Sequence, residues 1–200
     1  TIRNFEDFGS FRAGVICCPV DWVEYTKALL LEYGISSDSV CVVPGGKNRN
    51  SSVKNGCRYF NERFNITEND VILTHDAVRP FIDARIIKDN ITAVSEYGAA
   101  NTVRPLYDSV IKSVTGEFFT EHMKRSEIYR VQTPQSFKLK ELHNLINSLS
   151  EEELETYTDV ASIFADRGYR VKLVDGSDYN IKLTTPFDLA VAQTIITNLP

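Results

Sequence analysis

The sequence predicts an α/β fold in which a mostly parallel central sheet is covered by helices on both faces. Short β-rich runs alternate with helical patterns along the chain, as they do in βαβ units. The runs are almost entirely apolar, which is typical of strands that are buried on both sides. The chain has 200 residues, 42% of them hydrophobic and 24% charged. This length and composition suit one domain with a buried core.

The first half of the chain is predicted to contain three strands and two helices. The strands are the β-rich runs at residues 13–18, 39–43 and 71–74. A helix is expected between the first two strands, because Asp21 and Glu24 have the spacing of a capping box and Gly34 suits a left-handed stop. Another helix is expected after Asn50.

The second half is predicted to continue the alternation around one excursion. Apolar residues at helical spacing predict a helix over 83–98. Between residues 107 and 132 short alternating pieces surround Gly116, which predicts a β-hairpin that leaves the sheet. The acidic run 151–155 is expected to be a solvated connection. The other predicted elements are helices at 138–149 and 158–167, strands at 169–174 and 180–183, and a last helix that opens at Pro186.

Charge and composition exclude several classes of protein. The net charge of −5 argues against a nucleic-acid partner. Without a long apolar run or a signal pattern, we expect a cytoplasmic protein with no membrane partner. The four cysteines lack C-x-x-C spacing and are expected to be core thiols, and a zinc centre is not indicated. Neither a nucleophile elbow nor a dinucleotide-binding glycine motif is present in the sequence.

Four polar clusters follow apolar runs, where ligands bind in sheets of this class. They lie at residues 44–53, 74–80, 124–135 and 180–189. In the first, a glycine pair before a helix suits an anionic ligand, although such a turn is also an ordinary connection. In the second, Asp76 suits Mg²⁺ and Arg79 suits a phosphate, or the two form a local ion pair. In the fourth, Lys182 either meets a ligand or extends to solvent.

Together the clusters resemble, in order and over nearly the whole chain, the cytidylyltransferases that act on methylerythritol phosphate and ribitol 5-phosphate. The most specific pieces are Gly45-Gly46-x-x-Arg49-x-x-Ser52-Val53, His75-Asp76-Ala77-Val78-Arg79-Pro80, Gln132-Thr133-Pro134-Gln135, Thr158-Asp159 and Asn180-Ile181-Lys182. The resemblance implies a three-layer, Rossmann-like nucleotidyltransferase fold with a protruding β-arm. It implies one domain over 1–200, and an arm at about 106–132 that forms a homodimer.

The resemblance also implies a nucleotide site and its catalytic residues. Asp76 is expected to bind Mg²⁺, and Lys182 is expected to face the triphosphate of CTP. We therefore expect the two side chains to converge on one bound triphosphate. The expected nucleotide-binding residues are Gly46, Lys47, Ser52 and Ala77.

The polyol phosphate is expected to lie beside the nucleotide, between two subunits. Arg125 would reach it from the arm of the second subunit, and Ser109 keeps a hydroxyl where the erythritol enzymes carry threonine. The residues expected from the first subunit are Arg79, Ser109, Thr133, Thr158 and Asp159.

The implied reaction is attack by a phosphate-monoester oxygen on the α-phosphorus of CTP. Segments 74–81, 132–137 and 179–189 look more like the ribitol phosphate branch, which makes CDP-ribitol for teichoic acid or capsule, than the isoprenoid branch. Family members open with a strand, a glycine-rich loop bearing an arginine, and a Pro-Lys pair, and this chain is expected to begin after them. A non-catalytic nucleotide-binding module is therefore the alternative of another class.

Overall fold

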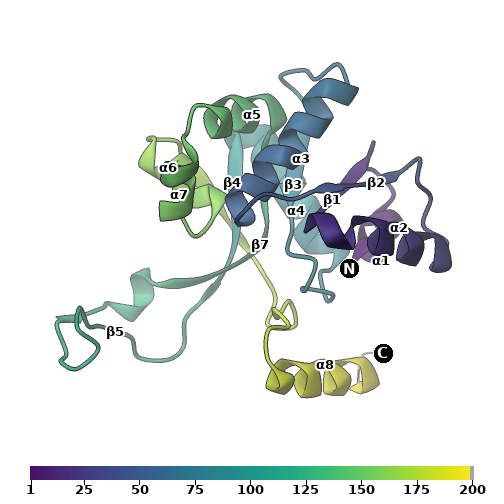
Figure 1. Cartoon of the computed structure of the whole chain (residues 1–200). Helices are drawn as coiled ribbons and strands as arrows, with labels where there is room; N and C mark the ends of the chain where they lie inside the picture. Colours follow the sequence, from purple (N-terminus) through teal and green to yellow (C-terminus); the bar gives the residue numbers. More distant parts are fainter. Residues whose placement is uncertain (199–200) are drawn as a thin grey trace.

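A computed structural model describes residues 1–198 of the chain (Figure 1). The elements of the first half are α1 (Ile2–Phe8), β1 (Gly14–Cys18), the 3₁₀ turn η1 (Val20–Trp22), α2 (Val23–Glu32), β2 (Val40–Pro44), α3 (Arg49–Arg63), β3 (Val71–Thr74) and α4 (Ala84–Tyr97). Those of the second half are β4 (Ala99–Pro105), β5 (Ile111–Lys112), β6 (Glu121–His122), η2 (Arg125–Glu127), β7 (Tyr129–Lys138), α5 (Leu139–Asn147), α6 (Glu151–Thr156), α7 (Val160–Asp166), β8 (Val171–Asp175) and α8 (Pro186–Asn198).

The main sheet has the strand order β3-β7-β4-β8 and is mixed. Strand β7 runs antiparallel to β3 and β4, while β4 and β8 are parallel. Strands β1 and β2 form a separate parallel pair. The α/β class is thus confirmed. The antiparallel strand arises because β4 leads out into the arm and β7 returns from it.

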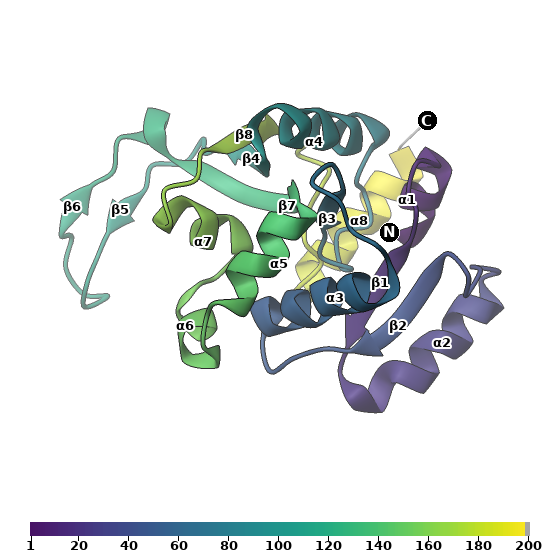
Figure 2. The same ribbon diagram turned by 90° about the horizontal axis from the view of Figure 1, so that it is seen from above.

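Helices cover both faces of the main sheet (Figure 2). Helix α4 packs on one face, against β4, β7 and β8, and helices α5 and α7 pack on the other. Ala99 and Ala100 are neighbours in β4, yet they belong to different core clusters because successive side chains point to opposite faces. The larger cluster centres on Phe137 and Phe164, whose ring centroids lie 4.5 Å apart. Burying one such side chain stabilises the fold by roughly 1.5–3 kcal/mol.

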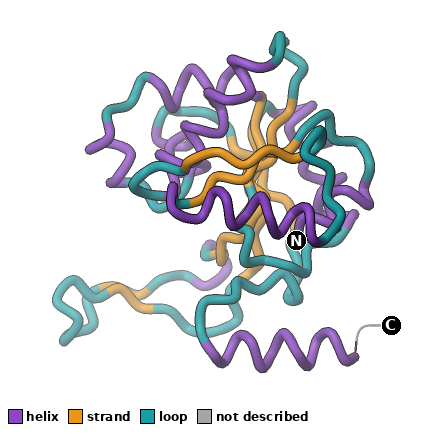
Figure 3. Tube along the Cα trace, turned by 45° about the vertical axis from the view of Figure 1, so that its right-hand side comes forward, coloured by secondary structure: helices purple, strands orange, loops and turns teal. Residues whose placement is uncertain are grey.

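Most elements read from the sequence are confirmed. Helix α4 starts after Asp83, whose side chain accepts a hydrogen bond from the backbone N–H of Ile86. It ends at Gly98, and Gly34 after α2 likewise has a positive φ. Strands β4 and β7 are absent from the sequence-based prediction. Strands occupy the centre of the molecule, and α8 lies at the end of a loop away from them (Figure 3).

Three local predictions are wrong. Asp21 is not a helix cap, because it lies inside η1, and α2 begins after Trp22 without a side-chain cap. The acidic run forms helix α6, because Ser150 and Glu153 make a capping box and carboxylates in the first turn suit the helix dipole. Residues 180–183 form no strand, since their main chain reaches its neighbour through one bond, from Leu183 N–H to the carbonyl oxygen of Val78.

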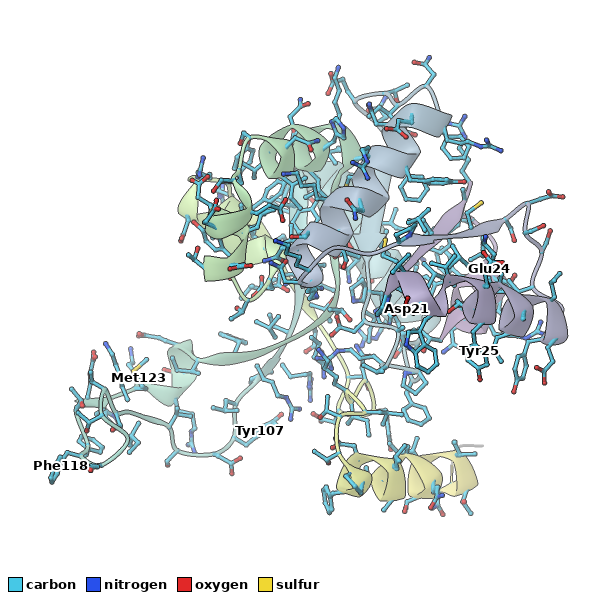
Figure 4. The ribbon with its side chains drawn as sticks, in the orientation of Figure 1. Asp21, Glu24, Tyr25, Tyr107, Phe118 and Met123 are labelled. Carbon is cyan, nitrogen blue, oxygen red and sulfur yellow. The ribbon has the colours of Figure 1, made fainter. Side chains whose placement is uncertain are left out.

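The predicted hairpin is an arm, residues 106–128, that projects from the main body (Figure 1). Fewer residues pair than predicted, and the paired residues lie farther apart in the sequence, since Ile111 is opposite His122. Phe118 marks the tip of the arm in Figure 4 and is 72% exposed. Within residues 1–198, no helix combines the length and the apolar character needed to cross a membrane.

Candidate active site

A cavity of about 210 Å³ lies beside the loop that follows β3. Strand β7 forms one wall of it, and α3, the residues just before α7 and the chain before α8 each contribute side chains. The lining residues are Arg49, Asp76, Arg79, Val131, Gln132, Thr133, Gln135, Thr158, Asp159 and Lys182.

Three cationic side chains meet the carboxylate of Asp76. Arg49 Nε lies 3.1 Å from Oδ1, while Arg79 Nε and Lys182 Nζ lie 3.4 Å and 3.1 Å from Oδ2. Burial of Asp76 opposes its charged form, but Arg49 and Lys182 outweigh this effect, so the pKa of the carboxyl group lies below its usual value. The side chains of Asp76 and Lys182 thus meet, as the predicted triphosphate site requires.

The turn before α3 places Arg49 at the first position of that helix. Asn48 caps the helix, because its side chain accepts a hydrogen bond of 2.8 Å from the N–H of Ser51. The N–H of Gly46 donates to Ser52 Oγ at 3.0 Å. A Cβ atom on Gly46 would lie 2.3 Å from that of Ser51, so a glycine is required in this turn.

A neutral histidine orients the backbone at Asp76. His75 Nε2 lies 3.0 Å from the carbonyl oxygen of Arg79, which can only accept, so Nε2 carries the proton. Nδ1 is then an acceptor for the hydroxyl group of Thr133 at 3.1 Å. That hydroxyl oxygen in turn accepts a hydrogen bond of 3.1 Å from the N–H of Asp76. Burial lowers the pKa of His75 to about 4, which keeps the ring neutral at pH 7.

Asp159 lines the same cavity as Asp76 and is held by the helix that it caps. Its carboxylate caps α7 by accepting hydrogen bonds from the N–H and the hydroxyl group of Ser162, at 2.9 and 3.1 Å. Gln135 Nε2 donates to the same carboxylate at 2.9 Å. Thr158, its neighbour, also lines the cavity. The hydroxyl group of Thr158 donates to the Asp159 carboxylate as well, at 3.4 Å, so Asp159 is fixed in place.

The structure brings together part of the predicted site. Asp76, Arg79, Thr133, Lys182 and the pair 158–159 line one cavity. The predicted nucleotide residues Gly46, Lys47, Ser52 and Ala77 do not line it: the first three lie in or beside the turn before α3, and the carbonyl oxygen of Ala77 accepts a hydrogen bond from Thr1. Ser109 and Arg125 lie in the arm, where Arg125 Nη1 donates to the carbonyl oxygen of Tyr107 at 3.1 Å.

Sequence reasoning gave no role to four lining residues: Arg49, Val131, Gln132 and Gln135. The signal for Arg49 was available, since it stands in the motif Gly45-Gly46-x-x-Arg49 that opens α3. Gln132 and Gln135 likewise stand in the motif Gln132-Thr133-Pro134-Gln135, but the motif assigned no individual role to them. Their roles depend on side chains that β7 alone brings to the cavity.

The donor set fits a magnesium ion that arrives with phosphate. Among residues 1–198, no group of three or more histidine, cysteine or acidic side chains gathers that could hold a metal ion by itself. Mg²⁺ is commonly bound by one or two carboxylates together with substrate phosphates and water. Asp76 would supply one such ligand.

We predict that His75 makes the fold sensitive to acid. Its pKa is about 4 in the folded chain and 6.5 in an exposed ring, so between these values the unfolded state binds more protons. The free energy of unfolding therefore falls as pH drops from 6.5 to 4, by up to about 1.4 kcal/mol per pH unit. We would measure the free energy of unfolding in urea at pH 7 and at pH 4.5. The loss between the two pH values should be smaller for His75→Gln than for the wild type.

His122→Gln is the control for this prediction, because it removes an exposed ring in the arm. It should keep the wild-type difference between the two pH values. An equal difference in the His75→Gln protein would contradict the assignment of acid sensitivity to the buried ring.

Comparison with known proteins agrees with this geometry. The family model described as 2-C-methyl-D-erythritol 4-phosphate cytidylyltransferase (IspD) matches residues 1–198. A ribitol-5-phosphate cytidylyltransferase of Lactiplantibacillus plantarum is 42% identical over 98% of this chain and 83% of its own length. The solved structure of a 4-diphosphocytidyl-2C-methyl-D-erythritol synthase from Anaerococcus prevotii has a TM-score of 0.83 at 24% identity, covering 99% of this chain and 84% of its own.

A second solved structure gives a more limited match. The 2-C-methyl-D-erythritol 4-phosphate cytidylyltransferase of Thermus thermophilus is 26% identical, with a TM-score of 0.65, and the match covers 80% of this chain and 74% of its own. The match of the family model over nearly every residue, supported by a cavity that gathers the predicted motifs, shows that the chain belongs to the IspD cytidylyltransferase family.

Proposed function

We propose that the chain transfers CMP from CTP to D-ribitol 5-phosphate, giving CDP-ribitol and pyrophosphate. The observation that carries the proposal is the group of Arg49, Arg79 and Lys182 around Asp76 in one cavity. Such a group suits a ligand with several phosphates. The similarity to a ribitol-5-phosphate cytidylyltransferase favours ribitol as the polyol. CDP-ribitol would be made in the cytoplasm as a precursor of teichoic acid or capsule.

The reaction requires positioning and charge stabilisation more than acid–base chemistry. The attacking phosphate-monoester oxygen is already anionic near neutral pH, so no general base is needed. Lys182 and the arginines would hold phosphate oxygens in line and stabilise the charge that develops on the α-phosphate. Bound Mg²⁺, with Asp76 as its protein ligand, would neutralise further phosphate charge. Gly46, Lys47, Ser52 and Ala77 would bind the nucleoside.

The polyol phosphate is expected to lie on the β7 side of the cavity. Arg79, Thr133, Thr158 and Asp159 offer one guanidinium group, two hydroxyl groups and one carboxylate there. Such groups match a ligand that carries both a phosphate and several hydroxyls. We propose that Ser109 and Arg125 complete the polyol site when the arm meets a second subunit.

The test of the proposed function is pyrophosphate release by the full-length protein with CTP and either polyol phosphate. We expect release with D-ribitol 5-phosphate and little with 2-C-methyl-D-erythritol 4-phosphate. The reverse preference would identify the isoprenoid enzyme as the correct alternative. No release with either polyol, while CTP still binds, would favour the non-catalytic module.

We predict that Lys182→Ala lowers kcat by about 10²-fold or more, the usual cost of removing one electrostatic stabiliser of a transition state. Steady-state pyrophosphate release measures the effect. Lys140→Ala is the control, because Lys140 is also exposed and ion-paired, with Glu68, but lies outside the cavity. Near-wild-type turnover by Lys182→Ala would rule out the role proposed for this lysine.

We also predict that the arm joins two subunits. Phe118 and Phe119 lie in the arm and are 72% and 62% exposed. Replacing both with aspartate should convert a dimer to a monomer in light scattering, because the charges cannot be desolvated in an apolar interface. Trp22→Asp alters an aromatic residue of similar exposure on the main body and should leave the mass unchanged. A dimeric Phe118→Asp/Phe119→Asp protein would contradict this interface.

A further inference from the structure

Lys182 reaches Asp76 on a segment that crosses one end of the main sheet. The sheet has the order β3-β7-β4-β8, and the chain leaves β8 at one edge after Asp175. It returns at the other edge, where Leu183 N–H donates to the carbonyl oxygen of Val78, close after β3. Residues 176–185 between β8 and α8 belong to no strand or helix. Apart from the bond of Leu183 to Val78, the position of Lys182 depends on side-chain contacts made during the crossing.

Gln132 makes the first of these contacts from β7, in the middle of the sheet. Its Oε1 accepts a hydrogen bond of 3.2 Å from the N–H of Ser177, and its Nε2 donates to the carbonyl oxygen of Ser177 at 2.8 Å. A backbone peptide group on a neighbouring strand makes the same pair of bonds. The side-chain amide of Gln132 thus takes the place of a neighbouring strand for Ser177. Ser177 follows Gly176, whose N–H makes a main-chain bond to the carbonyl oxygen of Val103 in β4.

The fit around this amide is close. Gln132 is 2% exposed, so both of its bonds are shielded from water. A Cβ atom on Gly176 would lie 2.2 Å from Gln132 Oε1. Only glycine therefore lets the turn approach the amide closely enough for both bonds to form.

Asn180 makes the second contact and connects it to the cation cluster. Its side-chain Nδ2 donates to the carbonyl oxygen of Thr133 at 2.8 Å, the residue after Gln132 in β7. The main-chain carbonyl oxygen of Asn180 accepts a hydrogen bond of 2.8 Å from Arg79 Nη1. The turn held by Gln132 thereby places Asn180, and Asn180 is two residues before Lys182.

We propose that Gln132 is a positioning residue: its amide fixes the 176–180 turn so that Lys182 Nζ lies at the phosphate-binding face of Asp76. The inference rests on the proposed function, in which Lys182 acts on the triphosphate. Gln132 needs no contact with CTP in this role. In this proposal the effect of Gln132 on turnover passes through Lys182, although Gln132 also lines the cavity.

A double-mutant cycle tests this dependence in the full-length protein. Gln132→Met keeps the size of the side chain and removes both bonds. With Lys182 present it should lower kcat by about 10-fold or more, since small misplacements of catalytic groups carry such costs. In the Lys182→Ala background the same change should lower kcat less than about twofold, because contacting groups that act together are not additive. An equal loss in both backgrounds would overturn the proposal.

A second variant and a second readout keep the test decisive. Gly176→Ala keeps glutamine at position 132 but places a methyl group against its amide, which should break the same two bonds. Its effect on kcat should therefore depend on Lys182 in the same way, and this variant can replace Gln132→Met if that protein does not fold. Pyrophosphate binding by calorimetry, measured over the same cycle, needs no turnover. If the wild type releases no pyrophosphate from CTP, the proposed function fails, and the binding cycle still decides the role of Gln132.

Asn90→Leu is the matched control. Asn90 is fully buried and its amide donates to Ile86 and Thr102, but it touches neither the 176–180 turn nor the cavity. The variant should lower stability in thermal unfolding, and its effect on turnover should be the same with lysine or alanine at position 182. If the control shows the same dependence on Lys182 as Gln132→Met, general loosening of the fold would explain both, and the specific role would be refuted.

Discussion

The site depends on one partly buried carboxylate that attracts three cations, two of them from distant parts of the chain. Asp76 follows β3, and its partners come from the start of α3, from its own loop and from the chain before α8. A charge with 12% exposure is costly to leave unpaired, so each cation stabilises both the carboxylate and the geometry of the cavity. The same arrangement stores positive charge beside a space large enough for phosphate groups. The same charged side chains therefore stabilise the fold and are placed to bind the ligand.

Strand β7 is the element that makes this arrangement possible. It is the central antiparallel strand, and it carries an unusual number of buried polar side chains: Gln132, Thr133, Gln135 and Ser136. Each forms at least one hydrogen bond, as buried polar groups require. Their bonds extend to the loop after β3, to the cap of α7 and to the turn after β8. One strand thus sets the relative positions of three functional segments.

The same feature explains which parts of the fold could be read from the sequence. Strands β1, β2 and β3 were predicted because their residues are apolar, and α4 because its cap and its periodicity agree. Strand β7 was missed because the buried part of its sequence, Gln132-Thr133-Pro134-Gln135-Ser136, has neither apolar alternation nor an apolar run. The convergence of Asp76 and Lys182 was predicted from family motifs. Arg49 and Gln132 stand in such motifs as well, but the ion pair of Arg49 with Asp76 and the bonds of Gln132 to Ser177 are tertiary contacts that no local pattern specifies.

Strand β7 is also continuous with the arm, so a restraint on the arm would act on the wall of the cavity. Tyr129 and Arg130 pair with the outer end of β4 at the root of the arm, and Gln132 and Thr133 begin the cavity wall only a few residues later. A neighbouring subunit that braces the arm would restrain the start of this strand, at Tyr129. By thermodynamic reciprocity, substrate that tightens the wall must then strengthen association by the same factor. Catalytic competence and assembly would respond together to protein concentration, although no residue of the main body need touch the partner.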